Sequence, residues 1–265
     1  MAKKEPTKIS AKIWRQTIDK LEMKLDAACL RRDAYLSRVL AVELPHLERE
    51  ICLSNSPDAN RFVASRLELL GERKLVTFSL QSDVADRLNE ICEQKLIVRD
   101  AFLNRLLLLL AASPTLIDKL FFKDVEDDWR TSVLEGLVSP SSREGRTSIV
   151  WEDDRPDGPF FNNAFYPLEP LIDPFWSIRL GIEKTEVAEL SEYTDPATGS
   201  VFMAEKGLGE GVFWLSKGIY SLLFDDKQFK DLNLYGLNCF VPDWRIPGHE
   251  AERRHQKKLD ELFGD

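Results

Sequence analysis

The chain has 265 residues and a net charge of −9, with 43% hydrophobic and 31% charged residues, which excludes wholesale disorder and a membrane bundle. Its longest apolar run, residues 106–112, is far shorter than the ~20 residues of a membrane-spanning helix, and no apolar signal segment follows the first lysines. We therefore expect a cytoplasmic protein that does not contact a membrane.

Charge and aromatic residues divide the chain into two parts. Residues 1–113 carry 19 Lys and Arg against 16 Asp and Glu, whereas residues 114–265 carry a net charge of −12 and 21 of the 26 aromatic residues. The acidic total disfavours nucleic acid, but the charge of each segment decides which partner that segment attracts. The first 15 residues form a basic arm with Glu5 as its one acid; its basic residues are Lys3, Lys4, Lys8, Lys12 and Arg15.

A repeat fills the first part of the chain. The segment RDAYLSRVL at residues 32–40 returns as RDAFLNRLL at residues 99–107, an offset of 67 residues. The similarity extends without a gap over about 8–47 and 75–114. Each copy therefore predicts the same small structural unit.

Each copy opens with a segment of alternating polarity, which is the two-residue period of a half-buried strand. The inward-facing residues are Ile9, Ala11, Ile13, Val76, Phe78 and Leu80, and the outward-facing ones are Lys8, Ser10, Lys12, Leu75, Thr77 and Ser79. A lone strand is unstable in water, so each must pair with another. The partner is either the repeat in the same chain or the matching strand of a second chain.

Two helices are predicted after each strand. Apolar residues at helical spacing define the first helix, with Ser82 as the N-cap in the second copy. The second helix begins at an Arg-Asp pair, with Asp33 or Asp100 near its positive end. The expected buried positions are Ile18, Leu21, Leu25, Leu36, Val39 and Leu40, and in the second copy Val84, Leu88, Ile91, Cys92, Leu103, Leu106 and Leu107.

Between the copies, residues 53–59 predict a loop, and the following apolar pattern predicts a helix that ends at Gly71. The predicted organisation has four parts: a first unit with its basic arm (1–47), a helical connector (48–73), a second unit (74–114) and an acidic, aromatic-rich C-terminal domain (120–265).

The C-terminal part has loops rich in Pro and Gly, acids and large aromatic residues, which predict a mixed α/β domain. Strands are predicted at 148–151, 176–180 and 212–215, and helices at 183–193 and 217–224. We expect this domain to form a homo-oligomer, or to bind a partner protein or a small-molecule effector.

Motifs for catalysis and metal binding are weak. His249 and His255 are six residues apart, whereas a zinc-binding HExxH helix needs four. The four cysteines lack a CxxC spacing and are expected to be packing residues in a reducing compartment. The sequence predicts no metal ion, no cofactor, no catalytic residue and no enzymatic activity.

The two copies resemble the ribbon-helix-helix superfamily, to which the Arc and methionine repressors belong. The resemblance covers about residues 8–114 and rests on the alternating strand, the two helices and the Arg-Asp entry to the second helix. It implies an α+β fold in which two ribbon-helix-helix units form a pseudo-dimer within one chain, followed by the mixed α/β C-terminal domain.

The resemblance also implies that an antiparallel ribbon lies in the major groove of double-stranded DNA. The implied base-reading residues are Lys8, Ser10, Lys12, Thr77 and Ser79. Leu75 departs from this pattern because it cannot hydrogen-bond a base; it contacts a thymine methyl group or marks a weaker reader. Phosphate contacts are expected from the second-helix N-termini and the arm, through Lys3, Lys4, Arg31, Arg32 and Arg99. For Arg32 and Arg99 the alternative is a salt bridge to the neighbouring helix.

We therefore expect a sequence-specific DNA-binding protein, a bacterial transcriptional repressor, whose residues 1–114 bind DNA without the rest. One alternative is an accessory DNA-binding protein of plasmid partition or conjugation. Another is an antitoxin whose C-terminal half binds a toxin. A third is an effector enzyme with its activity in residues 120–265.

Overall fold

The computed structural model describes residues 5–122, 174–175, 178–179, 182, 218–224 and 234–263. These residues form an α+β fold. The elements in chain order are β1 (Thr7–Trp14), α1 (Arg15–Ala27), α2 (Arg32–Glu50), α3 (Pro57–Leu67), β2 (Arg73–Leu80), α4 (Ser82–Gln94), α5 (Arg99–Ala111), α6 (Pro114–Phe121), the 3-10 turns η4 (Tyr235–Leu237) and η5 (Asp243–Arg245), and α11 (Glu250–Phe263).

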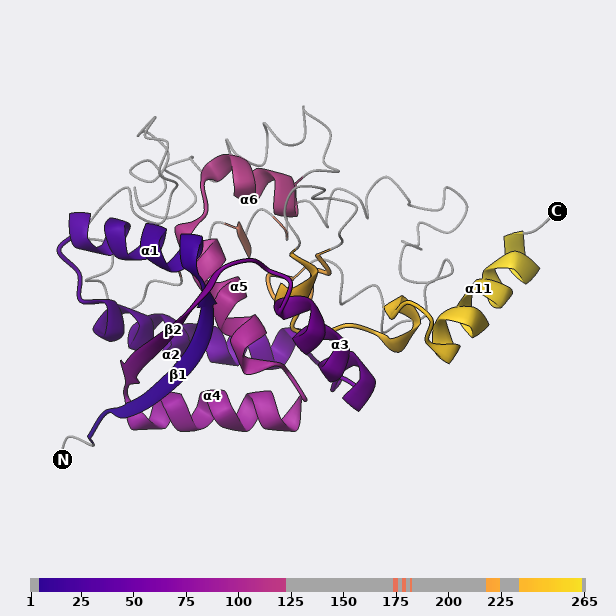
Figure 1. The fold of residues 1–265 in the computed structure, drawn as a ribbon, viewed down its shortest axis with the longest axis horizontal. Helices are drawn as coiled ribbons and strands as arrows, with labels where there is room; N and C mark the ends of the chain where they lie inside the picture. Colours follow the sequence, from indigo (N-terminus) through magenta and orange to yellow (C-terminus); the bar gives the residue numbers. More distant parts are fainter. Residues whose placement is uncertain are drawn as a thin grey trace, which may run out of the picture.

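The two repeat strands pair with each other inside one chain. β1 and β2 form an antiparallel ribbon whose register runs from Thr7 opposite Leu80 to Trp14 opposite Arg73 (Figure 1). The predicted inward-facing residues of both strands are all buried. Ser10 lies opposite Thr77, its own repeat equivalent, so an approximate two-fold axis passes between these two residues.

The helices follow the same approximate symmetry. α1 and α4 each have 13 residues, and the predicted apolar positions on all four repeat helices are buried. Both first helices end in a left-handed residue, Cys29 with φ 55° and Leu96 with φ 50°. This conformation is uncommon for a residue with a side chain. Here it turns the backbone of each copy sharply from the first helix into the second.

Four helix boundaries differ from the predictions. α3 ends at Leu67 and not at Gly71, because residues 68–71 form turns and bends. α3 begins at Pro57, inside the predicted loop, because the Ser56 hydroxyl accepts a hydrogen bond from the Ala59 N–H and proline suits the first helical turn. Ser82 is the first residue of α4 and not its N-cap, a position that Gln81 occupies. α2 continues past residue 47 to Glu50 with Pro45 inside it.

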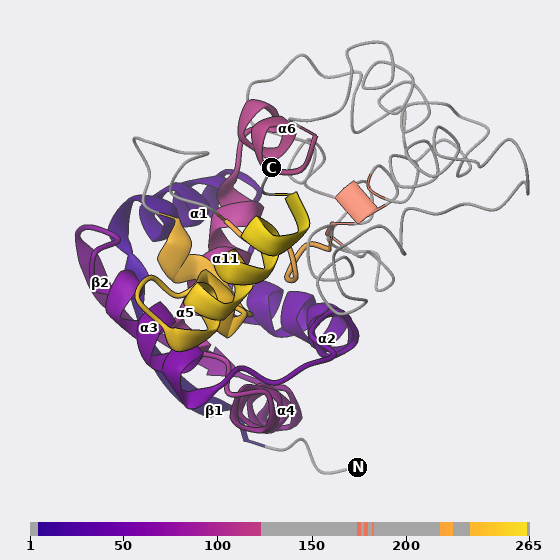
Figure 2. The same cartoon turned by 90° about the vertical axis from the view of Figure 1, so that its right-hand side faces the viewer.

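Residues from the C-terminal part complete the core of the first part. α5 is buried on all sides from Ala101 to Ala111, as expected of a central helix. The Asn55 side chain donates to the Cys239 carbonyl (2.8 Å) and accepts from the Val241 N–H (3.0 Å). The orange and yellow C-terminal segment lies over α3 and α5 (Figure 2), with η4 in contact with both. The core therefore crosses the predicted boundary near residue 114.

Several predicted C-terminal elements, 148–151, 183–193 and 212–215, lie outside the described residues. The strand predicted at 176–180 is wrong where it is described, because Ile178 and Arg179 are helical. The helix predicted at 217–224 is also wrong over residues 218–224, which form turns. Short apolar runs of this kind do not distinguish strand from helix by periodicity.

The cysteines fall into two groups. Cys92 and Cys239 are buried, and burial raises the pKa of both thiols to about 12, so they stay protonated at neutral pH. Cys29 and Cys52 are exposed, so the expectation that all four are packing residues is wrong for these two. Among the described helices, none has the length and apolar character to cross a bilayer.

Candidate nucleic-acid interface

The outward face of the ribbon carries the predicted base-reading residues together. Lys8, Ser10, Lys12 and Thr77 are exposed, and Ser79 is half-buried. The hydroxyl groups of Ser10 and Thr77 are hydrogen-bonded at 3.0 Å across the two-fold axis. Leu75 also points outward and is 70% exposed, which is unusual for a leucine in a strand that has an apolar inner face.

The Asp of each Arg-Asp pair lies at the start of α2 or α5 and hydrogen-bonds the strand of the other copy. The Ser79 N–H donates to Asp33 Oδ2 (3.0 Å), and the Lys12 N–H donates to Asp100 Oδ2 (2.9 Å). One edge N–H group of each strand is thus paired by an aspartate of the opposite unit. This symmetric contact explains why the Arg-Asp sequence returns in both copies.

The two arginines of these pairs also bond within the protein. Arg32 Nη2 donates to the Thr77 carbonyl (2.8 Å), and Arg99 Nη2 donates to the Ser10 carbonyl (2.9 Å). Arg32 Nη1 further contacts Glu22 on α1 at 2.6 Å. This geometry matches the salt-bridge alternative for Arg32, while Arg99 bonds Asn89 of the neighbouring helix α4 (3.3 Å).

The remaining residues predicted to contact phosphate differ between the two copies of the repeat. Arg31, the residue before α2, is exposed, whereas its repeat equivalent before α5 is the half-buried Val98. Lys3 and Lys4 lie outside the described residues.

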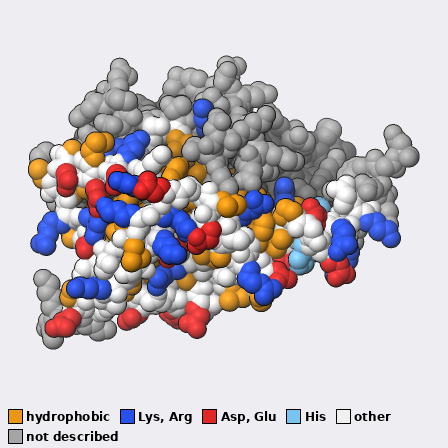
Figure 3. Space-filling view, in the orientation of Figure 1, with side chains coloured by type: hydrophobic (Ala, Val, Ile, Leu, Met, Phe, Trp, Pro, Cys, Tyr) orange, Lys and Arg blue, Asp and Glu red, His pale blue; other side chains and the backbone are white. Residues whose placement is uncertain are grey.

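Acidic side chains lie beside the basic ones at one end of the ribbon, as the neighbouring red and blue side chains show (Figure 3). Lys12 Nζ is 4.0 Å from Glu68, Arg73 also pairs with Glu68, and Arg15 pairs with Glu72. The lysine and both glutamates are more than half exposed, so solvent screening keeps these pairs weak. The basic side chains can therefore exchange these carboxylates for other anions.

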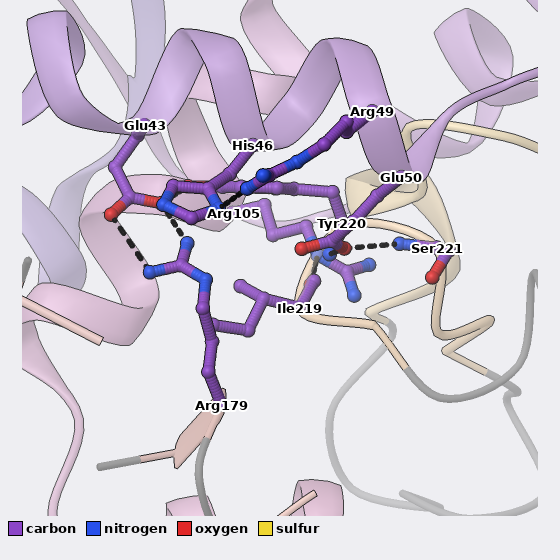
Figure 4. A network of polar contacts seen from close by, with 9 residues as sticks. All are labelled: Glu43, His46, Arg49, Glu50, Arg105, Arg179, Ile219, Tyr220 and Ser221. Atoms are coloured by element: carbon purple, nitrogen blue, oxygen red, sulfur yellow. Dashed lines mark hydrogen bonds and ion pairs between the residues drawn. The ribbon is translucent and has the colours of Figure 1, made fainter. Parts of the chain in front are cut away.

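A second polar cluster lies on the far side of α2, buried against the C-terminal part (Figure 4). The Glu43 carboxylate is fully buried, accepts from the Tyr220 hydroxyl (2.5 Å) and pairs with Arg179. Glu50 accepts from the backbone N–H groups of Tyr220 (2.6 Å) and Ser221 (3.3 Å). Two carboxylates of α2 thus hold segments that are more than 120 residues away in sequence.

Arg105 is fully buried in α5 and belongs to the same cluster. Its Nε donates to the Ile219 carbonyl (2.7 Å), its Nη2 to the Leu222 carbonyl (2.9 Å), and its guanidinium carbon lies 3.9 Å from the centre of the Phe224 ring. Burial lowers the pKa of Arg105. The burial of Arg105 was not predicted from the sequence. Its repeat equivalent is also an arginine, Arg38, and that side chain is exposed, so the repeat pattern does not distinguish the two positions.

Replacing Glu50 by Gln should change how stability depends on pH. Burial raises the pKa of Glu50 above 4.5, so the folded protein binds this proton more tightly than the unfolded chain. The stabilisation from Glu50 is complete below pH 4.5 and falls as pH rises through the folded pKa. As pH rises above 4.5, the free energy of unfolding measured in urea should therefore fall less for Glu50→Gln than for the wild type. Exposed Glu93→Gln is the control, and parallel curves for all three proteins would contradict the expectation.

The described residues contain no group of three or more His, Cys, Asp and Glu side chains arranged to hold a metal ion. Comparison of the chain with protein-family models, with curated proteins and with solved structures finds no match. Among the described residues, the exposed face of the ribbon brings the predicted base-reading residues together.

Proposed function

We propose that this protein binds double-stranded DNA sequence-specifically, as a single-chain ribbon-helix-helix protein, and acts as a transcriptional repressor. The observation that carries the proposal is the intrachain antiparallel ribbon, whose outward face carries lysine and hydroxyl groups around an approximate two-fold axis, with Leu75 as the apolar exception. A two-stranded ribbon fits the major groove, where lysine and hydroxyl groups can hydrogen-bond base edges.

The rigidity of the ribbon supports the same proposal. Both strands are held from behind by buried apolar residues and at their edges by Asp33 and Asp100. The backbone that carries the outward side chains is therefore ordered before DNA arrives, so little backbone entropy is lost on binding. A protein held tightly on one DNA site blocks other proteins there, which is the basis of the proposed repressor role.

The experiment that tests the proposal is duplex binding by the full-length chain at low salt, measured by fluorescence anisotropy. Lys8→Ala combined with Lys12→Ala removes two outward lysines of β1. A good base contact contributes about 1–3 kcal/mol, so the double variant should bind at least about 30-fold more weakly. The salt dependence of binding should also become less steep.

The matched control removes the same charge elsewhere. Arg253→Ala with Arg254→Ala changes two exposed residues of α11, which lies at the opposite end of the molecule from the ribbon (Figure 1). This control should bind DNA within about threefold of the wild type, because α11 lies at the opposite end of the molecule from the ribbon and salt screens charges far from the bound duplex. Equal losses in the two double variants, or no binding by the wild type, would refute the proposal.

A further inference from the structure

The two halves of the ribbon are related by the approximate two-fold axis, but their outward side chains differ. The repeat equivalent of Lys8 is Leu75, and that of Lys12 is Ser79. Only the central pair, Ser10 and Thr77, keeps the same hydroxyl chemistry on both sides. At each of the other two outward positions, one half carries a lysine and the other half does not.

This difference determines which DNA sites can satisfy both halves. A palindrome centred on the axis presents the same base edge to Lys8 and to Leu75. Lysine donates hydrogen bonds and is matched by the O6 and N7 acceptors of guanine, whereas leucine has no donor and is matched by a thymine methyl group. No single base edge suits both residues. Lys12 and Ser79 can both donate to guanine, but they differ in charge and in reach.

The flanks of the ribbon are unequal in the same sense. A groove of about 880 Å³ lies beside the turn between α1 and α2, and its charged lining residues are three arginines and three acids: Arg31, Arg32, Arg38, Glu22, Asp26 and Asp33. The groove related to it by the axis, beside the turn between α4 and α5, has about 530 Å³ and is partly lined by residues of α3. There Asn60 Nδ2 donates to the Leu96 carbonyl at 2.8 Å, so the connector covers that turn.

We propose that the ribbon recognises a non-palindromic duplex in one fixed orientation, with guanine at the positions under Lys8 and Lys12 and thymine at the position under Leu75. This inference rests on the proposed function, because it specifies the DNA that the same surface reads. The side with Arg31 offers the DNA backbone an exposed cation that its counterpart lacks, because the half-buried Val98 stands at the equivalent position there and residues of α3 line that groove.

The test is selection of bound fragments from random duplex DNA with the full-length chain, followed by affinity measurements on the selected site and on two palindromes built from its halves. The wild type should select a non-palindromic site and bind both palindromes more weakly. Leu75→Lys gives both halves a lysine at the equivalent position. It should bind the palindrome built from the Lys8 half about tenfold better, relative to the selected site, than the wild type does.

Leu69→Lys is the matched control, because Leu69 is 60% exposed but lies outside both strands. It adds the same charge and should raise the affinity for all duplexes alike, without changing their ranking. A wild-type site that is palindromic about the axis of a single ribbon, or the same effect from both lysine substitutions, would overturn the inference while leaving DNA binding intact. Failure of the wild type to bind any duplex at low salt would instead overturn the proposed function.

Discussion

Replacing Arg105 by Ala is expected to lower the free energy of unfolding by about 3–5 kcal/mol. The substitution removes a fully buried side chain, leaves the Ile219 and Leu222 carbonyls without their donors, and takes a positive charge away from Glu50. Each of these changes costs stability because water cannot reach the groups left behind. Urea unfolding followed by circular dichroism measures the effect.

Two further variants separate the causes. Arg105→Met keeps most of the buried volume, so the difference between the Met and Ala variants reports the cavity and the remainder reports the lost polar contacts. Arg61→Ala is the control for removing an arginine, because its side chain is 78% exposed and should change stability by less than about 0.5 kcal/mol. A loss below about 1 kcal/mol for Arg105→Ala would show that the carbonyl groups find other donors.

A chain that ends at Phe122 is expected to melt more than about 10 °C below the full-length protein, because it loses several kcal/mol of buried contacts. Arg105 would lose both carbonyl partners, Glu43 would lose Tyr220, and the side of α5 that faces η4 would become exposed. Differential scanning calorimetry measures the melting temperature, and binding of a hydrophobic dye measures the newly exposed apolar surface. The repeat copies would then form the ribbon without a complete core beneath it.

This expectation replaces the simpler one that residues 1–114 act as a complete DNA-binding fragment. A fragment that melts within about 3 °C of the full-length chain would contradict it. Fragments are therefore unsuitable for judging DNA affinity, since weak binding by a partly unfolded fragment would say nothing about the ribbon. Full-length variants of surface residues avoid this problem.

Local periodicity was sufficient to predict the ribbon strands and their inner faces. Alternation at Ile9, Ala11 and Ile13 gave the buried face correctly, because a strand has a period of two and one face must leave water. The gapless repeat likewise aligned Asp33 with Asp100, although their contacts with the opposite strands depend on the fold and are absent from the sequence pattern.

The buried cluster could not be predicted in the same way. Arg105 and Arg38 are equivalent in the repeat, yet one is fully buried and the other exposed, because residues 219–224 of the C-terminal part cover the side of α5 that carries Arg105. Similarly, Asn60 contacts the α4–α5 turn through a connector that has no counterpart in the other copy. Both differences come from long-range packing, and sequence periodicity reports only which residues share one face of an element.

Because β1 and β2 belong to one polypeptide, the ribbon forms by a unimolecular reaction. A ribbon shared by two chains dissociates on dilution and can exchange strands with related proteins in the same cell. Here the two strands are held at a fixed effective concentration by the chain between them. The concentration of assembled ribbons is therefore proportional to the concentration of chains, even when a cell holds only a few copies. A ribbon shared by two chains would instead form, at low concentration, in proportion to the square of the chain concentration.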